Sequence, residues 1–311
     1  MMVYNRSKND GENTYSIDRL TFDFYFVPQP GLTAKIKAAF DMHAAVQRHR
    51  MDVQAFQTNR LAVEKQVYQF DAFHAEVYER GNVVLLGKNN PETGEPKRVA
   101  VPGVPQTVLR LDFNPNNCVE NPVLMAVMEF LAGAIDDMPY TWSLSRVDYA
   151  LDIPGTPDDF YILSRKAETF YENTRYYGER KATGRLKVYD KRRERIEKAR
   201  HDIGRDLTRF EWTQRGNRDF NFKFDQICRY TPEMSGTYAA LLQFVRPEMI
   251  NHALGVLDKR TKQKVKNQCF HPLTLDQSLY VMLLDEYLAE YSLPLDLRRD
   301  WEKQFQSVPS A

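Results

Sequence analysis

Tyr189 is the residue of this sequence best suited to covalent chemistry. It lies in the segment TRYYGERKATGRLKVYDK, which predicts two short strands, 174–177 and 185–189, joined by a basic turn. Alternation along the second strand puts Tyr189 on the same face as Arg185 and Lys187. A free tyrosine has a pKa of about 10 and needs neighbouring positive charge to act as a nucleophile at neutral pH. The same alternation is also typical of an ordinary amphipathic hairpin with a solvated face.

Carboxylates recur on the neighbouring predicted strands. Asp148 and Asp152 share one face of the strand 144–153, and Glu211 lies on the strand 207–214. Two carboxylates so close on one face crowd negative charge unless a cation lies beside them. A divalent ion or a bound basic group would relieve this crowding. The alternative is that these acids face solvent or pair with arginines.

Positive charge is concentrated around the tyrosine. From Arg175 to Arg200 the sequence carries eleven Lys and Arg residues but only four Asp and Glu residues. Such a local excess is typical of a surface that binds a polyanion. The alternative is a solvated helix stabilised by pairs such as Glu194–Lys198. A second basic run, 258–266, could also follow phosphates along a nucleic acid.

Composition and simple motifs restrict the class of protein. The 311 residues carry 43 Lys and Arg against 42 Asp and Glu, so the overall charge indicates no partner. The three cysteines, Cys118, Cys228 and Cys269, lack the spacing of a zinc ribbon or a disulfide framework and suit a reducing cytoplasm. No stretch has the apolar length of a signal peptide or a membrane span, so we expect a cytoplasmic protein. The sequence contains no P-loop, GxGxxG, HExxH or His-apolar-His motif.

The hydrophobic pattern predicts an α+β fold: a central antiparallel sheet with helices packed on it, followed by a helical C-terminal region. We expect a disordered tail over 1–14, a catalytic domain over 15–231 and a helical region over 232–311. The elements expected to frame the tyrosine are strands 17–27, 107–113 and 144–153, a loop over 89–105, and helices 32–49, 121–137 and 156–171.

Four blocks, taken in order, resemble the Rep_trans replication initiation factors. This family includes initiators of staphylococcal-type rolling-circle plasmids, certain phage initiators and some conjugative relaxases. The blocks cover the chain from about 17 to 215, and the segment LDFNPN (111–116) is also similar to the family. They are IDRLT (17–21), SRVDYALD (145–152), the hairpin with YGER (177–180) and VYDK (188–191), and TRFEWTQ (208–214). The hairpin departs from the family pattern because Lys181-Ala182-Thr183 intervenes where Ser or Thr often follows Gly-x-Arg.

The resemblance implies a site-specific DNA nicking and joining enzyme. Tyr189 matches the catalytic tyrosine, which leaves a 5′-phosphotyrosine and a free 3′-OH. The neighbouring positive charge that this tyrosine needs has Arg180 and Lys191, with Lys187 and Arg146, as candidates. The resemblance implies Mg²⁺ or Mn²⁺ on carboxylates, and the matching positions are Asp148, Asp190 and Glu211, with Asp152 in reserve.

The resemblance also indicates partners and rival functions. The expected substrate is origin DNA, single-stranded or extruded as a hairpin, and the family allows a host helicase and a second copy of the chain as partners, with no membrane. The leading interpretation is a rolling-circle replication initiator of a plasmid or phage. The alternatives are a relaxase of a conjugative element and a catalytically inactive DNA-binding regulator of the same fold.

Overall fold

The fold is taken from a computed structural model of the whole chain. The structure describes residues 6–42, 50–58, 61–70, 72–80, 83–89, 96–100, 106–118, 121–133, 139–162, 168–179, 184–216, 227–229, 250–269, 271–291 and 293. In these ranges no helix combines the length and the apolar character that a membrane crossing requires.

The chain forms two compact units, each assembled from separate stretches of sequence. The first unit contains residues 18–147 and 284–311, with residues 1–5. The second unit contains residues 6–17 and 148–283. This division differs from the predicted boundaries, because it cuts the chain within strands β2 and β9 rather than in a linker.

The first unit is built on an antiparallel sheet. Its strand order is β9-β2-β8-β5-β4-β3, in which β2 pairs with β8 and the chain returns to it through a four-strand meander. The strands are β2 (Asn13–Phe26), β3 (Arg50–Thr58), β4 (Leu61–Gln69), β5 (Phe73–Arg80), β8 (Gln106–Phe113) and β9 (Tyr140–Pro154).

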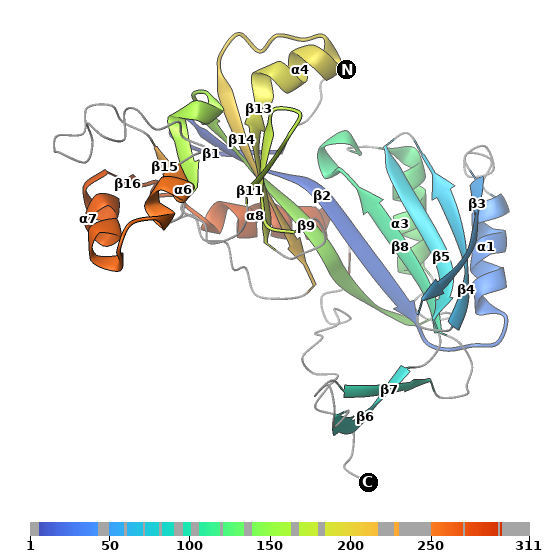
Figure 1. Cartoon of the computed structure of the whole chain (residues 1–311). Helices are drawn as coiled ribbons and strands as arrows, with labels where there is room; N and C mark the ends of the chain where they lie inside the picture. The colour runs from blue at the N-terminus through green and yellow to red at the C-terminus, as the bar shows by residue number, and fades with distance from the viewer. Residues whose placement is uncertain are drawn as a thin grey trace. The chain divides into compact units, whose positions relative to one another are not determined.

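Helices cover one face of this sheet (Figure 1). They are α1 (Leu32–Met42) and α3 (Pro122–Gly133), and a short turn, η1 (Pro115–Asn117), precedes α3. Leu32, Ile36 and Phe40 recur at helical spacing in α1 and are all buried, so this apolar stripe fixes the helix on the sheet. A separate hairpin, β6 (Val83–Asn89) and β7 (Pro96–Ala100), interrupts the meander between β5 and β8.

The second unit repeats the same strand order. Here β9 pairs with β14, and the meander runs β14-β13-β12-β11. The strands are β11 (Glu168–Tyr171), β12 (Thr174–Tyr177), β13 (Arg185–Asp190) and β14 (Leu207–Arg215), and β1 (Lys8–Asp10) pairs with the start of β2. Glu172 and Asn173, both with positive φ, form the tight turn between β11 and β12.

Helices and a small sheet complete the second unit. The small sheet has the order β10-β15-β16. These elements are η2 (Pro157–Asp159), β10 (Phe160–Ile162), α4 (Lys191–Ala199), β15 (Ile227–Arg229), α6 (Ile250–Gly255), α7 (Lys259–Cys269), β16 (His271–Pro272) and the first part of α8 (Ser278–Glu290), whose residues up to Leu283 belong to this unit.

Aromatic contacts fasten α8 to the second unit. The ring of Tyr280 packs edge-on against Tyr149 at 5.1 Å and against Tyr15 at 5.2 Å, centroid to centroid. Its hydroxyl donates a hydrogen bond of 2.9 Å to the carbonyl of Ala150 on β9. Such edge-to-face pairs add specificity to the burial of large rings.

The structure confirms the α+β class and the predicted hairpin with its following helix. Three expectations differ. The predicted helix 156–171 is one 3-10 turn followed by strands, because β10 pairs with β15 across the small sheet. The predicted loop 89–105 contains β7, and the predicted disordered tail contains β1 and the start of β2. The last part of the predicted helical region, from 294 to 311, lies outside the described residues.

Candidate active site

The predicted tyrosine face exists as one face of the β13–β14 pair. Tyr189 lies directly opposite Arg209, and Lys187 lies directly opposite Glu211. Leu186 alternates with these residues and is buried on the other face, as the sequence predicted. The hairpin therefore presents a polar surface backed by an apolar one. We call this surface the tyrosine face; it comprises Arg185, Lys187, Tyr189, Arg209, Glu211 and Thr213.

Two cations lie close to the Tyr189 side chain. The Lys191 ammonium is 5.8 Å from the centre of the Tyr189 ring, within reach of a cation–π interaction. Lys191 is itself buried and forms an ion pair with Glu194. Arg209 is the neighbour across the strand pair. Lys191 pairs with Glu194 and Arg209 pairs with Asp152, so both cations beside the phenol are also bound by carboxylates.

Arg180, another of the predicted assisting cations, lies outside the described residues. Arg146 lies on β9. Arg185 stacks over the ring of Tyr176 with its guanidinium carbon 4.3 Å from the ring centre. Tyr176 lies on β12, directly opposite Lys187 on β13. This stack therefore extends the tyrosine face onto a third strand.

Arg209 is the functional candidate that sequence reasoning missed. Alternation places it on the same strand face as Glu211, but its position opposite Tyr189 depends on the register of two strands. The side chain is buried, and its guanidinium forms a two-point ion pair with Asp152, with both hydrogen bonds 2.6 Å long. Alternating charge along β14 is the only sequence signal that indicated it.

The four predicted acids have different environments. Asp148 is 2% exposed on β9 and shares a strand face with Asp152. Glu211 is 8% exposed and accepts a hydrogen bond from Lys187. Asp152 is engaged by Arg209, which is the pairing that the alternative interpretation foresaw. Asp190 caps helix α4, where its carboxylate accepts a 2.9 Å hydrogen bond from the Arg193 amide.

Asp148 and Glu211 are the two acids considered further as ligands of a divalent ion, and Lys187 binds Glu211 in this structure. Both are buried oxygen donors on neighbouring strands, β9 and β14. Mg²⁺ commonly binds one or two carboxylates and completes its coordination with water and substrate phosphate oxygens. Within the described ranges no set of three or more His, Cys, Asp and Glu side chains is arranged to hold a metal. Two carboxylates with a phosphate therefore fit such an ion better than a cage made by the protein alone.

The second basic run and the last part of the first one fold as helices. On α4 several cations form ion pairs, among them the Glu194–Lys198 pair that the sequence suggested, at 3.1 Å. Arg192, in the first turn of α4, forms ion pairs with Asp202 and Asp206. These pairs hold the start of the helix to the segment leading into β14. The second run forms α7, where Lys259, Arg260 and Lys264 are exposed.

Comparison with known proteins gives one match along the whole chain. The sequence is 23% identical over 328 aligned positions to a replication initiation protein from Staphylococcus aureus, and the alignment covers 96% of this chain and 94% of that one. No protein-family model matches. A rolling circle replication initiator protein from Geobacillus stearothermophilus overlays 84% of this chain and 100% of its own with a TM-score of 0.35 and 11% identity. The chain is therefore similar along almost its whole length to a replication initiation protein, which agrees with the resemblance that the four sequence blocks indicated.

Proposed function

We propose that this protein initiates rolling-circle replication by nicking and rejoining DNA at an origin, with Tyr189 as the nucleophile. The observation that carries the proposal is the position of Tyr189 opposite Arg209, on a sheet face that also holds Lys187 and Glu211. The full-length similarity to a replication initiation protein supports the same function.

The reaction exchanges one phosphodiester bond for another. The Tyr189 hydroxyl loses its proton and its oxygen bonds to the scissile phosphorus, while the bond from phosphorus to the 3′ oxygen breaks. The 3′ oxygen takes up a proton, and the 5′ phosphate stays on the tyrosine. Because the covalent intermediate conserves the bond energy, the reverse attack by a 3′-OH rejoins the strand without ATP.

Residues around Tyr189 would supply the electrostatic part of catalysis. Lys191 and Arg209 favour the ionised phenol, and Lys187 places a further positive charge near the phosphate that reacts. Mg²⁺ or Mn²⁺, held by Asp148 and Glu211, would polarise the phosphoryl oxygens. Arg180 remains a predicted contact to the phosphate, and the exposed cations of α7 would bind the DNA backbone nonspecifically.

A nicking assay tests the proposal. The full chain is incubated with supercoiled DNA that carries the cognate origin and with Mn²⁺. We expect nicked circles with protein attached to the 5′ end, and mass spectrometry should place the adduct on the peptide containing Tyr189. Tyr189→Phe should abolish the adduct, whereas Tyr171→Phe, a change at an exposed residue of β11, should leave it unchanged.

The rival functions give different results. An inactive DNA-binding regulator would bind the origin equally well with and without Tyr189→Phe and would nick it in neither case. A relaxase would nick an origin of transfer in preference to a replication origin. A covalent adduct that persists in Tyr189→Phe would refute Tyr189 as the nucleophile.

A further inference from the structure

The two units share one connectivity, and each carries a tyrosine in the third strand of its meander. In the first unit β2 is followed by the meander β3-β4-β5-β8, whose last strand pairs back with β2. In the second unit β9 is followed by β11-β12-β13-β14, whose last strand pairs back with β9. The third meander strand ends with Val77-Tyr78-Glu79-Arg80 in the first unit and with Val188-Tyr189-Asp190 in the second, where Lys191 follows as the first residue of α4.

The polar faces of the two sheets also correspond. In the first unit Asp23 on β2 forms a two-point ion pair with Arg110 on β8, with hydrogen bonds of 2.6 and 2.9 Å. In the second unit Asp152 on β9 forms the same kind of pair with Arg209 on β14. Each pair links the first strand of its unit to the last strand of the meander.

Tyr78 nevertheless lacks the environment of a nucleophile. Burial raises its pKa to about 12, and although the neighbouring Arg110 lowers it, Asp23 and Glu76 raise it again. A phenol with this pKa stays protonated at neutral pH. In addition, Glu76 rather than a tyrosine lies opposite Arg110, so the first unit keeps the fold without the tyrosine–arginine pair of the second unit.

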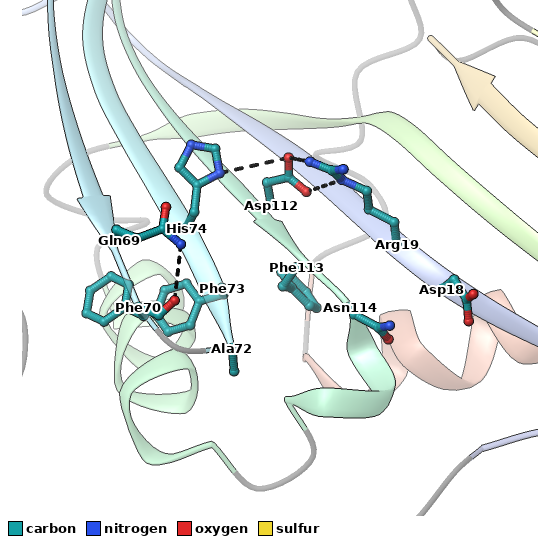
Figure 2. Close-up of a pocket in the computed structure, with 10 residues that line it drawn as sticks. All are labelled: Asp18, Arg19, Gln69, Phe70, Ala72, Phe73, His74, Asp112, Phe113 and Asn114. Carbon is teal, nitrogen blue, oxygen red and sulfur yellow. Dashed lines mark hydrogen bonds and ion pairs between the residues drawn. The ribbon is translucent and has the colours of Figure 1, made fainter. Parts of the chain in front are cut away.

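The first unit has instead a cavity on this polar face, with a volume of about 410 Å³ (Figure 2). Ligand cavities in proteins typically range from about 300 to 1,000 Å³, so this one suits a group the size of one nucleotide. Residues of β2, β5 and β8 contribute polar groups to its wall, and Phe73 and Phe113 contribute apolar surface.

Flat groups in the cavity wall are held in fixed orientations. The Arg19 guanidinium is clamped in its own plane by two hydrogen bonds to Asp112, and its side chain keeps 40% of its surface exposed. The ring of His74 lies between two carboxylates, with Nε2 3.1 Å from Glu76 and Nδ1 3.9 Å from Asp112. Figure 2 shows His74 and Arg19 on either side of Asp112. Arginine and histidine planes of this kind are surfaces on which unpaired bases stack.

The charges in the cavity favour a base over a phosphate. Asp18 and Asp112 both line it, and Asp112 already neutralises Arg19, so an added anion would find no unbalanced cation there. The amide side chains of Gln69 and Asn114 also line the cavity; the Gln69 Nε2 donates to the Phe70 carbonyl and the Asn114 Oδ1 accepts from the Asn116 amide, so each retains one polar atom that can match a neutral base. Cavity size, flat walls and charge all favour the same ligand class.

We infer that the first unit is a non-nicking copy of the catalytic fold, and that its Arg19–His74 cavity binds one unpaired base of a single DNA strand. This inference rests on the proposed function, because that function supplies single-stranded DNA. In this arrangement one copy of the fold cuts the strand and the other holds a nucleotide of it.

Binding measured without the chemistry tests the inference. The full chain carrying Tyr189→Phe is titrated into fluorescein-labelled oligo(dT) of twelve nucleotides, and anisotropy gives the Kd. Stacking contributes about 1–3 kcal/mol per base, so losing it should weaken binding by roughly five- to a hundredfold. We expect this loss in Arg19→Ala, which removes a flat wall, and in Ala72→Trp, which fills the cavity and removes no side-chain hydrogen bond.

Two controls make the result specific. Binding of a duplex of the same length should not change in either variant, because a paired base cannot enter the cavity. An oligonucleotide with 5-iodouracil should crosslink on irradiation to the peptide that contains Phe73 and His74. Unchanged Kd values in both variants, or crosslinks only elsewhere, would overturn the inference. If cavity variants weaken binding while no Tyr189 adduct ever forms, the proposed function fails and the binding site stands.

Discussion

Lys187 and Glu211 lie directly opposite each other on β13 and β14, and the Lys187 ammonium donates a hydrogen bond to the Glu211 carboxylate. Both side chains are largely buried, with 25% and 10% of their surfaces exposed. The carboxylate proposed to hold the metal is therefore already satisfied by a cation of the protein. Metal binding at Glu211 has to compete with Lys187.

Replacing this lysine should strengthen metal binding. Lys187→Met removes the competing cation, and calorimetry should show a higher affinity for Mn²⁺ than in the wild type. Glu211→Gln and Asp148→Asn should each weaken it. Lys198→Met is the matched control, because Lys198 pairs with Glu194 on the exposed side of α4. An Mn²⁺ affinity that stays constant or falls in Lys187→Met would count against Glu211 as a ligand.

The Asp152–Arg209 pair should matter for stability. Removing one partner of a buried ion pair leaves an uncompensated charge and typically costs about 3–5 kcal/mol. Asp152→Ala should therefore lower the free energy of unfolding in urea by about this amount. The exposed pair Arg193–Glu197 provides the control, since Glu197→Ala should cost at most about 1 kcal/mol. Equal effects of the two substitutions would contradict the burial of the Asp152–Arg209 pair.

Two substitutions of Asp190 separate capping from metal binding. Asp190→Ala removes the acceptor for the Arg193 amide and should destabilise the protein by about 1 kcal/mol. Asp190→Asn keeps a good cap and should leave the free energy of unfolding nearly unchanged. Because the carboxylate is engaged in the cap, we expect Asp190→Asn to keep its affinity for Mn²⁺. A loss of Mn²⁺ affinity at wild-type stability would identify Asp190 as a ligand, as the family resemblance implies.

Tyr78 should make the protein less stable in alkali. Its pKa in the folded state is raised by burial to about 12, above its ordinary value of 10. The unfolded chain therefore loses this proton first, so the stabilising effect is complete below pH 10 and is lost as the pH rises toward 12. Urea unfolding over this range should show a shallower decline in Tyr78→Phe than in the wild type. Identical pH profiles would exclude Tyr78 as a source of the decline.

What could be predicted from the sequence was local. The hairpin and helix α4 follow from alternation, from a capping aspartate and from charge spacing, all of which act within a few residues. The prediction of a helix over 156–171 was wrong, because the sequence carries a helix start signal but the helix does not continue beyond one turn. The Thr156 capping box forms, yet the chain leaves the turn at Phe160 to pair with Arg229.

Relationships between distant strands could not be predicted in this way. The position of Arg209 opposite Tyr189 depends on register, which no local pattern in β14 specifies. The cavity joins Arg19 to Asp112, which are 93 residues apart in the sequence. The shared connectivity of the two units could not be predicted either, because only the short Val-Tyr-acid-base pattern repeats in the amino-acid sequence.

The hydrogen bond from Tyr280 to the Ala150 carbonyl links the end of the chain to the middle of the acid-bearing strand. Ala150 lies between Asp148 and Asp152 on β9, so α8 holds the strand backbone between the two residues that carry these carboxylates. A premature stop codon upstream of residue 278 would remove this fastening while leaving every nominated ligand and the nucleophile encoded. Shortened versions of the gene that end after the last sequence block would accordingly yield a protein that retains its chemical groups and loses their alignment.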